Sequence, residues 1–429
     1  MSFPKYPAYK DSGVEWIGEI PTEWALSRIG SCFAERRQKV SDADYPPLSV
    51  TKNGIVPQLE TAAKTDNNDN RKCVIAGDFV INSRSDRRGS SGISPQNGSV
   101  SLINTVIRPS DRIYSRFSHY LLRSTAFQEE YYKYGKGIVA DLWSTNYNEM
   151  KLIYLALPPL PEQQTIASFL DRECGKIDAL IAEQERLIAL LAEKRQAVIS
   201  HAVTKGLNPN APMKDSGIPW IGMVPEGWEI VRFSRLVAIS EGQVDPRNEQ
   251  YASMILVAPN HIEAGTGRLR EMITAVDQNA ESGKYHYQAG AVLYSKIRPS
   301  LAKVVIAPVS GLCSADMYPL TSRGKLNHLY LTWLMLSPGF TAWAVMESDR
   351  VAMPKINREK LNEIMLPLPP LPEQLEISEY IKNEIINFDT TMNSTRTAIK
   401  LLKERRAALI SAAVTGKIDV RAQSKAIAA

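Results

Sequence analysis

The sequence predicts an α+β protein in which two similar domains of mixed helix and strand are joined by two long helices. Three observations carry this prediction. A Pro-rich start introduces a long amphipathic stretch at residues 157–206, a similar stretch returns at residues 368–417, and short β-type runs precede each of them. The repetition indicates a duplicated unit rather than two unrelated domains.

The first long helix is predicted between a Pro-rich start and a glycine. Pro158, Pro159 and Pro161 disfavour helix before it, and Gly206 suits the position just past a helix end. About 43 residues at roughly 1.5 Å each would form a rod on the order of 60 Å long. Its apolar residues keep a heptad spacing, which predicts that it pairs with another helix.

The second long helix repeats the first 211 residues later, and its polar exceptions fall at matching positions. Gln184 aligns with Thr395, and Arg195 aligns with Arg406. In antiparallel helices the Gln184 and Thr395 pair would meet near the middle, where a polar layer fixes the register. The predicted pairing surface consists of Leu170, Ile177, Gln184, Ile188, Leu191 and Arg195 on the first helix and Ile381, Phe388, Thr395, Ile399, Leu402 and Arg406 on the second.

The same antiparallel arrangement predicts ion pairs between the two helices. Arg195 would approach Glu384, and Arg406 would approach Glu173. The alternative is that both arginines face solvent.

A second repeated segment precedes each domain. The string KDSGVEWIGEIPTEW at residues 10–24 returns as KDSGIPWIGMVPEGW at residues 214–228, with its tryptophans at fixed spacing. We expect these tryptophans to hold the arm against the core, and ligand stacking is the alternative. The predicted parts are a first domain with its arm at 1–157, a first helix at 158–206, a second domain at 207–368, a second helix at 369–417 and a flexible C-terminal tail at 418–429.

Composition excludes several classes of protein. The chain is 44% hydrophobic and 23% charged, which is ordinary for a globular protein. It has no run of 18 apolar residues, and its first residues lack the apolar core of a signal peptide, so we expect a cytoplasmic location. The four cysteines stand far apart without a CxxC pair, which favours buried free thiols over a metal site or disulfides.

Basic residues gather in the loops between the β-type runs. Residues 71–137 hold eleven Lys or Arg against five Asp or Glu, which favours a polyanionic partner. Guanidinium groups, small hydroxyls and glycines are suited to contact base edges and phosphates, whereas a solvated charged loop is the alternative. The candidate DNA-binding residues are Arg84, Arg87, Arg88, Ser90, Ser91 and Lys136 in the first half, and Lys296, Arg298, Ser300, Lys303, Arg350 and Lys355 in the second.

Motifs for catalysis are absent from the sequence. There is no NPPY-like motif for a flipped adenine, no GxxxxGK[ST] loop for ATP and no HExxH pair, and the five histidines are isolated. We therefore expect no catalytic residues, no metal and no cofactor in this chain. A coiled-coil scaffold without DNA affinity is one alternative function, and a DNA-modifying enzyme is a weaker one.

Two copies of the order arm, variable domain, LPPLPEQ and long helix resemble the specificity subunits of Type I restriction-modification systems. The resemblance rests on DSGxxWIGxxPxxW twice, LPPLPEQ twice, the endings AVISHAVTKG and ALISAAVTGK, and GAVLYSKIRP at residues 290–299. The first domain departs from the pattern, because GDFVINSRSDRRG at residues 77–89 stands in place of the KIRP form.

The resemblance implies a fold and a set of partners. The two domains would be target-recognition domains that each read half of a split, asymmetric double-stranded DNA site. The helices would pack antiparallel, with pseudo-twofold symmetry between the halves, would set the unread spacer and would dock two methyltransferase subunits. S-adenosylmethionine would then act in the methyltransferase subunits, and ATP and Mg²⁺ in restriction and translocase subunits, with no membrane involved.

Overall fold

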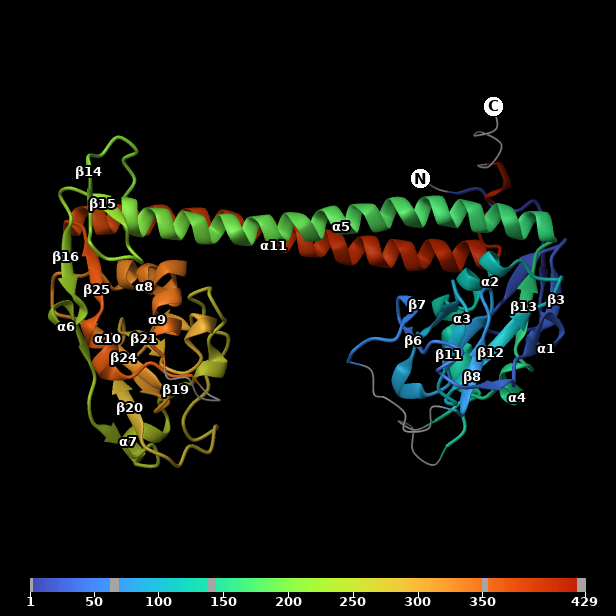
Figure 1. The fold of residues 1–429 in the computed structure, drawn as a ribbon, viewed down its shortest axis with the longest axis horizontal. Coiled ribbons are helices and arrows are strands. Elements are labelled where there is room, and N and C mark those ends of the chain that lie inside the picture. Colours follow the sequence, from blue (N-terminus) through green and yellow to red (C-terminus); the bar gives the residue numbers. More distant parts are fainter. Residues whose placement is uncertain (1–2, 62–68, 138–142, 349–353, 423–429) are drawn as a thin grey trace. The chain divides into compact units, whose positions relative to one another are not determined.

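The computed structural model describes residues 3–61, 69–137, 143–348 and 354–422 (Figure 1). It divides into two compact units, Met1–Glu185 with Thr397–Ala429, and Arg186–Arg396, which we call unit 1 and unit 2. Each unit holds one domain of mixed helix and strand, one half of each long helix and its own apolar core. The predicted α+β fold with two domains and two long helices is confirmed.

The two long helices are α5, Leu160–Lys205, and α11, Leu371–Val414. Each begins just after its Pro-rich segment, because proline removes a backbone donor and restricts the residue before it. A glycine follows each end, and both Gly206 and Gly416 adopt the left-handed conformation, with φ of 72° and 74°. Left-handed backbone costs little only in glycine, so these residues terminate the helices as the sequence predicts.

Within each unit the two helix halves run antiparallel. In unit 1 the Arg406 guanidinium lies 2.8 Å from the Asp178 carboxylate, and Lys403 lies 3.7 Å from Glu185. Later positions of α5 therefore meet earlier positions of α11. In unit 2 the last turns of α5 share a buried core with the first turns of α11, where Ile199 and Ile377 are both fully buried.

Burial divides the predicted pairing surface into a buried and a half-buried set. Leu170, Ile177, Arg195, Ile381, Phe388, Thr395 and Ile399 are buried. Gln184, Ile188, Leu191, Leu402 and Arg406 are half-buried.

The two predicted ion pairs are wrong in their partners. Arg406 does form an ion pair between the helices, but with Asp178, which lies about a turn beyond the predicted Glu173. Glu173 is held by its own helix, because it accepts from Arg172 at 2.9 Å and Lys176 at 3.0 Å. Arg195 turns away from Glu384 and donates to two backbone carbonyls of its domain, described below.

The domain of unit 1 contains several small sheets around one core. Its strands are β1 Tyr9–Asp11, β2 Glu19–Pro21, β3 Ala25–Arg28, β4 Phe33–Glu35, β5 Lys39–Val40, β6 Leu48–Thr51, β7 Gly54–Pro57, β8 Arg71–Val74, β9 Phe79–Asn82, β10 Ser91–Ile93, β11 Gly98–Val100, β12 Asn104–Pro109 and β13 Tyr154–Leu157. The largest sheet has the order β10-β9-β12-β4, and another has the order β11-β8-β5. Its short helices are α1 Ile29–Cys32, η1 Ser85–Arg87, α2 Ser115–Leu121, α3 Thr125–Lys133 and α4 Tyr147–Met150.

The domain of unit 2 repeats this plan with larger sheets. Its strands are β14 Met213–Asp215, β15 Met223–Pro225, β16 Glu229–Arg232, β17 Val237–Ile239, β18 Gln243–Val244, β19 Ile255–Val257, β20 Lys284–Tyr287, β21 Val292–Ser295, β22 Val304–Ile306, β23 Gly311–Cys313, β24 Met317–Ser322 and β25 Met365–Leu368. They form the orders β17-β24-β21-β22 and β18-β20-β23-β19. Its short helices are α6 Phe233–Leu236, α7 Glu249–Ala252, η3 Pro259–His261, η4 Pro299–Leu301, α8 His328–Leu336, α9 Pro338–Met346 and α10 Arg358–Glu363.

The repeated LPPLPEQ motif ties each helix start to its domain. The Glu162 carboxylate accepts from the Trp24 indole at 3.1 Å, and the Glu373 carboxylate accepts from Trp228 at 3.0 Å. Both tryptophans are 1% exposed, in agreement with their expected structural role. The next residue, Gln163 or Gln374, accepts from the backbone N–H of the residue just before helix α2 or helix α8. The motif thus fixes the angle at which each helix leaves its domain.

The end of the chain is packed rather than free. Val420 is fully buried, the Asp419 N–H donates to the Pro4 carbonyl at 2.8 Å, and the Arg421 guanidinium lies 4.7 Å from the Tyr6 ring centre. The prediction of a flexible tail at 418–429 is therefore wrong for residues 418–422. Residues 423–429 lie outside the described part of the chain.

Two further observations concern the described residues only. All four cysteines are buried free thiols, as predicted, and no group of three or more His, Cys, Asp or Glu could hold a metal ion. No single helix there is long and apolar enough to cross a membrane, and the one bent pair that passes by length and composition is α8 with α9. Both of those helices contribute to the core of unit 2.

Candidate nucleic-acid interface

The basic loop of unit 1 follows strand β9 and forms the single turn η1. Arg84 and Arg87 flank Asp86, with guanidinium nitrogens 3.3 Å and 3.7 Å from its carboxylate. Their side chains are 40% and 68% exposed, so both remain accessible to a ligand. Arg88 lies over the Tyr132 ring at 5.1 Å, which holds its guanidinium near the surface.

The two serines of this loop behave differently from one another. Ser91 belongs to β10, is 0% exposed and has a buried hydroxyl without a hydrogen-bond partner among the described residues. Because its side chain faces the core, the prediction that it contacts DNA is wrong. Ser90 is also buried, but it lines a surface cavity of about 570 Å³ together with Arg87 and Lys52.

A second predicted segment lies beside this loop. The backbone of Ser144 pairs with both Arg84 and Lys136, so residues far apart in the sequence are brought together. The Lys136 ammonium lies 3.0 Å from Glu149, and its side chain is 77% exposed. Lys136 is therefore accessible at the edge of the same surface.

In unit 2 the corresponding segments also meet. Ile297 pairs with Lys355, and the Arg298 N–H donates to the Pro354 carbonyl at 2.8 Å. Lys296 lies over the Tyr318 ring at 5.5 Å, while Arg298, Ser300 and Lys355 lie at or near the surface. The sixth predicted residue, Arg350, lies outside the described residues.

Arg298 is held in a strained conformation. Its φ is 47°, and Ala302, at the other end of the short η4 turn, has a φ of 43°. Residues other than glycine rarely adopt this left-handed backbone, and the strain persists only where surrounding contacts impose it. The turn therefore presents Arg298 and Ser300 outward in one fixed orientation.

Lys303 is half-buried, and its role as a DNA contact stays a prediction. Its ammonium donates to the Pro259 carbonyl at 2.5 Å, and burial lowers the pKa of the side chain. Sequence reasoning missed Arg358, which lies 5.6 Å from the centre of the same Tyr318 ring that Lys296 contacts. Arg358 donates to the Ile239 and Ser240 carbonyls, so it supports the surface rather than extending from it.

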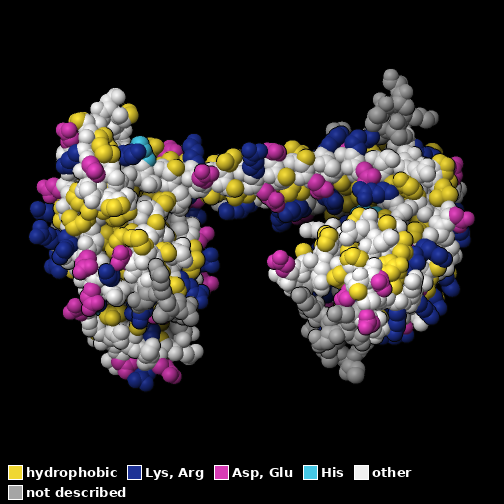
Figure 2. Space-filling model, in the orientation of Figure 1, with side chains coloured by type: hydrophobic (Ala, Val, Ile, Leu, Met, Phe, Trp, Pro, Cys, Tyr) yellow, Lys and Arg dark blue, Asp and Glu magenta, His cyan; other side chains and the backbone are white. Residues whose placement is uncertain are grey.

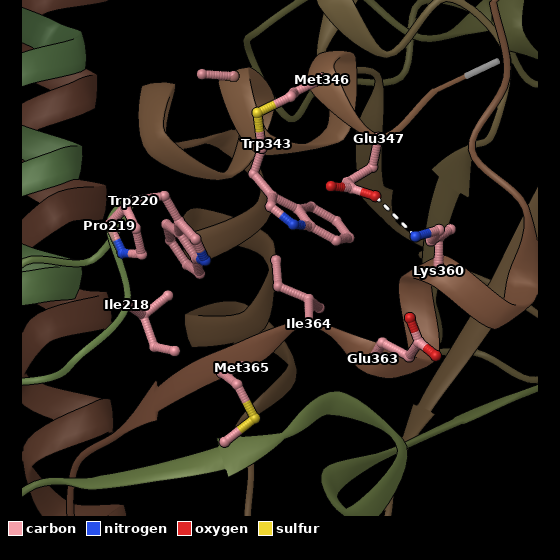
Figure 3. Close-up of a pocket in the computed structure, with 11 residues that line it drawn as sticks. Ile218, Pro219, Trp220, Trp343, Met346, Glu347, Lys360, Glu363, Ile364 and Met365 are labelled. Atoms are coloured by element: carbon pink, nitrogen blue, oxygen red, sulfur yellow. Dashed lines mark ion pairs between the residues drawn. The ribbon is translucent and has the colours of Figure 1, made fainter.

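Unit 2 carries a cavity of a different kind, of about 580 Å³, between its arm and helices α9 and α10 (Figure 3). Trp220 and Trp343 project into it, and its polar side is an ion pair of 3.1 Å between Glu347 and Lys360. An apolar, partly acidic cavity is unsuited to a polyanion. It is therefore separate from the basic surface.

Comparison with known proteins identifies the class of this chain. Residues 225–401 match the family model described as the Type I restriction modification DNA specificity domain. The Type I restriction enzyme EcoDI specificity subunit of Escherichia coli is 28% identical, over 94% of this chain and 90% of its own length. A putative type I restriction enzyme MjaX specificity subunit of Methanocaldococcus jannaschii is 22% identical, over 94% and 96%.

Solved structures share the fold. A chain from a structure concerning complex assembly and conformational transition of the type I R-M system has a TM-score of 0.69 at 16% identity, over 92% of this chain and 98% of that chain. The HsdS subunit from Thermoanaerobacter tengcongensis has a TM-score of 0.52 at 17% identity, over 93% and 98%.

Two repeated α+β domains with basic loops, joined by paired long helices, define a class of DNA specificity proteins. Within that class, the chain is similar to the specificity subunits of Type I restriction-modification systems, which its sequence also resembles.

Proposed function

We propose that each domain binds one half of a bipartite DNA target through its basic loop surface. The observation that carries this proposal is that the same two segments meet in both units but present different side chains. Unit 1 offers Arg84, Arg87 and Lys136, whereas unit 2 offers Lys296, Arg298 and Lys355. Different side chains on one framework favour different half-sites, so the whole target is asymmetric.

The long helices suit two further roles in this proposal. Each is continuous from one unit into the other, so their length sets the number of unread base pairs between the half-sites. Apolar side chains also emerge along them in Figure 2, and Leu180, Leu190 and Leu401 are 51%, 53% and 58% exposed. Exposed leucines on paired helices favour protein partners, and we assign them to two methyltransferase subunits.

Chemistry in this proposal belongs to the partner chains, and this chain acts in the cytoplasm as a non-catalytic reader. The methyltransferase subunits would use S-adenosylmethionine to methylate adenine, and restriction subunits would use ATP and Mg²⁺. The specificity subunit would determine which DNA sequence is bound and how many unread base pairs separate its two half-sites.

The test is to co-express the chain with its methyltransferase partner and to map N6-methyladenine across a genome. We expect one asymmetric target with two fixed parts and an unread gap. Arg84→Ala and Arg298→Ala should each relax a different part, with a discrimination loss of about 1–3 kcal/mol per lost base contact. Methylation without a split target, or variants that relax the same part, would refute the proposal.

A further inference from the structure

Unit 1 contains a cavity that the reading surfaces do not account for. It has a volume of about 320 Å³ and lies between the domain and the last third of helix α11. Four cations line it, namely Lys52, Arg88, Arg123 and Arg406. Among the described residues that line this cavity, none is acidic. The carboxylates nearby are already paired: Asp178 forms an ion pair with Arg406, and Asp171 pairs with Arg116 and accepts from the Tyr120 hydroxyl at 2.6 Å.

The other groups in the cavity cannot offset this charge. His119 lies 2.9 Å from the Arg123 guanidinium, and burial together with Arg123 lowers its pKa to about 3. Burial and the charge of Arg406 also lower the pKa of Arg123. Like charges held together in a half-buried site are unfavourable until an anion enters.

The internal repeat shows what the same position holds in unit 2. Arg406 aligns with Arg195. Arg123 aligns with Leu336, because each of these two residues directly precedes a serine that caps the next helix. In unit 2 the Arg195 guanidinium donates to the carbonyls of Gly265 and Thr266 at 2.6 Å and 3.1 Å.

A loop of unit 2 therefore fills the space that is open in unit 1. That loop packs on Leu336, since a Cβ on Gly267 would lie 3.2 Å from its side chain, and Arg268 forms an ion pair with Asp389 of α11. Carbonyl oxygens satisfy the arginine of the helix pair in unit 2. In unit 1 the described residues leave this place open, and further cations surround the arginine.

We propose that this cavity binds a backbone phosphate of the DNA duplex, an assignment that rests on the proposed function. Phosphate supplies the oxygens that the Gly265 and Thr266 carbonyls supply in unit 2, and it adds the negative charge that four cations require. Arginine forks match phosphate oxygens in a bidentate geometry.

Its position favours DNA over a carboxylate of a protein partner. Lys52 lines both this cavity and the adjacent one that holds Arg87 and Ser90 of the reading loop. Arg88 follows Arg87 directly, and Gly89, with a φ of 81°, lets the loop approach Gln128 at the cavity wall. A strand whose bases meet Arg87 would pass its phosphates to Arg88 and Lys52.

The test compares three forms of the full chain for binding to its target duplex: wild type, Arg123→Gln and the matched control Arg405→Gln. Arg405 is exposed on α11 and lies outside the cavity. Arg123→Gln removes the charge and keeps a polar amide at this position, but the shorter side chain gives up the bond from Arg123 to the Lys52 carbonyl at 2.5 Å. Arg123→Gln should weaken duplex binding by about tenfold, equally for target and non-target sequences, and lower the salt slope by about one.

Duplexes with single neutral methylphosphonate linkages identify the phosphate. At one linkage the wild type should lose affinity by about tenfold, while Arg123→Gln should lose none further. Equal binding by Arg123→Gln and wild type at every linkage would overturn the inference. So would a variant that captures less methyltransferase subunit while its duplex affinity stays unchanged. A wild-type chain without duplex affinity would instead refute the proposed function.

Discussion

At the scale of single residues, the repeated motif depends on a buried carboxylate. Glu162 is 8% exposed and accepts from the Tyr6 hydroxyl at 2.6 Å and from the Trp24 indole at 3.1 Å. Burial, together with the hydrogen bond and the charge of Glu162, raises the pKa of Tyr6 well above its usual range. The carboxylate thus joins the arm, the domain and the start of α5 at one point.

Replacement of this carboxylate should therefore destabilise unit 1. Glu162→Ala leaves two buried donors without an acceptor, and we expect a loss of roughly 2–4 kcal/mol in the free energy of unfolding. Glu373→Ala is the matched control. The Glu373 carboxylate accepts one side-chain hydrogen bond, from the Trp228 indole, whereas Glu162 accepts two. Urea denaturation of both variants measures the difference. An equal or larger loss for Glu373→Ala would contradict this explanation.

Several site residues could not be placed from the sequence alone. Arg84, Arg87 and Lys136 are recognisable by charge and loop composition, and all three have accessible side chains. Ser91 and Lys303 lie in segments of the same composition. However, Ser91 is buried in strand β10, and the Lys303 ammonium donates to the Pro259 carbonyl, which is distant in the sequence. Such orientations depend on contacts between residues far apart in the sequence, which a local pattern does not contain.

At the scale of elements, the helices are the most predictable part. Proline at the start, glycine at the end and heptad spacing are local signals, and both helices begin and end within a few residues of their predicted limits. The prediction of a flexible C-terminal segment is wrong for residues 418–422, because their packing depends on the arm at the other end of the chain, which a local pattern does not contain. Val420 is buried in the same core as Tyr6 and Trp24.

The packed segment should contribute measurably to stability. Val420→Ala removes two buried methyl groups, and we expect a loss of roughly 1–3 kcal/mol in the free energy of unfolding. Val309→Ala is a suitable control, because that valine is 44% exposed. Thermal unfolding of the full chain measures both. A Val420→Ala chain as stable as the wild type would show that the segment only rests on the surface of unit 1.

At the scale of the whole molecule, duplication explains which features vary. The arms, the LPPLPEQ contacts and the helix ends recur in both units, because they must hold the same geometry twice. The loops differ between the units. In unit 1 a cavity with four cations lies at Arg406, whereas in unit 2, among the described residues, the matching Arg195 donates to the carbonyls of Gly265 and Thr266. In the proposed function the loops read the bases and the framework holds the domains, so the framework can be altered without changing the bases that are read.

Lengthening the helices tests this separation directly. Seven residues inserted at facing positions of α5 and α11 preserve the heptad spacing and add about 10 Å, roughly three base pairs. We expect the unread gap in the methylated target to grow while both half-sites stay the same. Insertion into α5 alone shifts its apolar positions against α11 and should reduce stability and methylation together. If the paired insertion instead alters a half-site and leaves the gap constant, the helices do not set the spacing, and the domains must locate their half-sites independently.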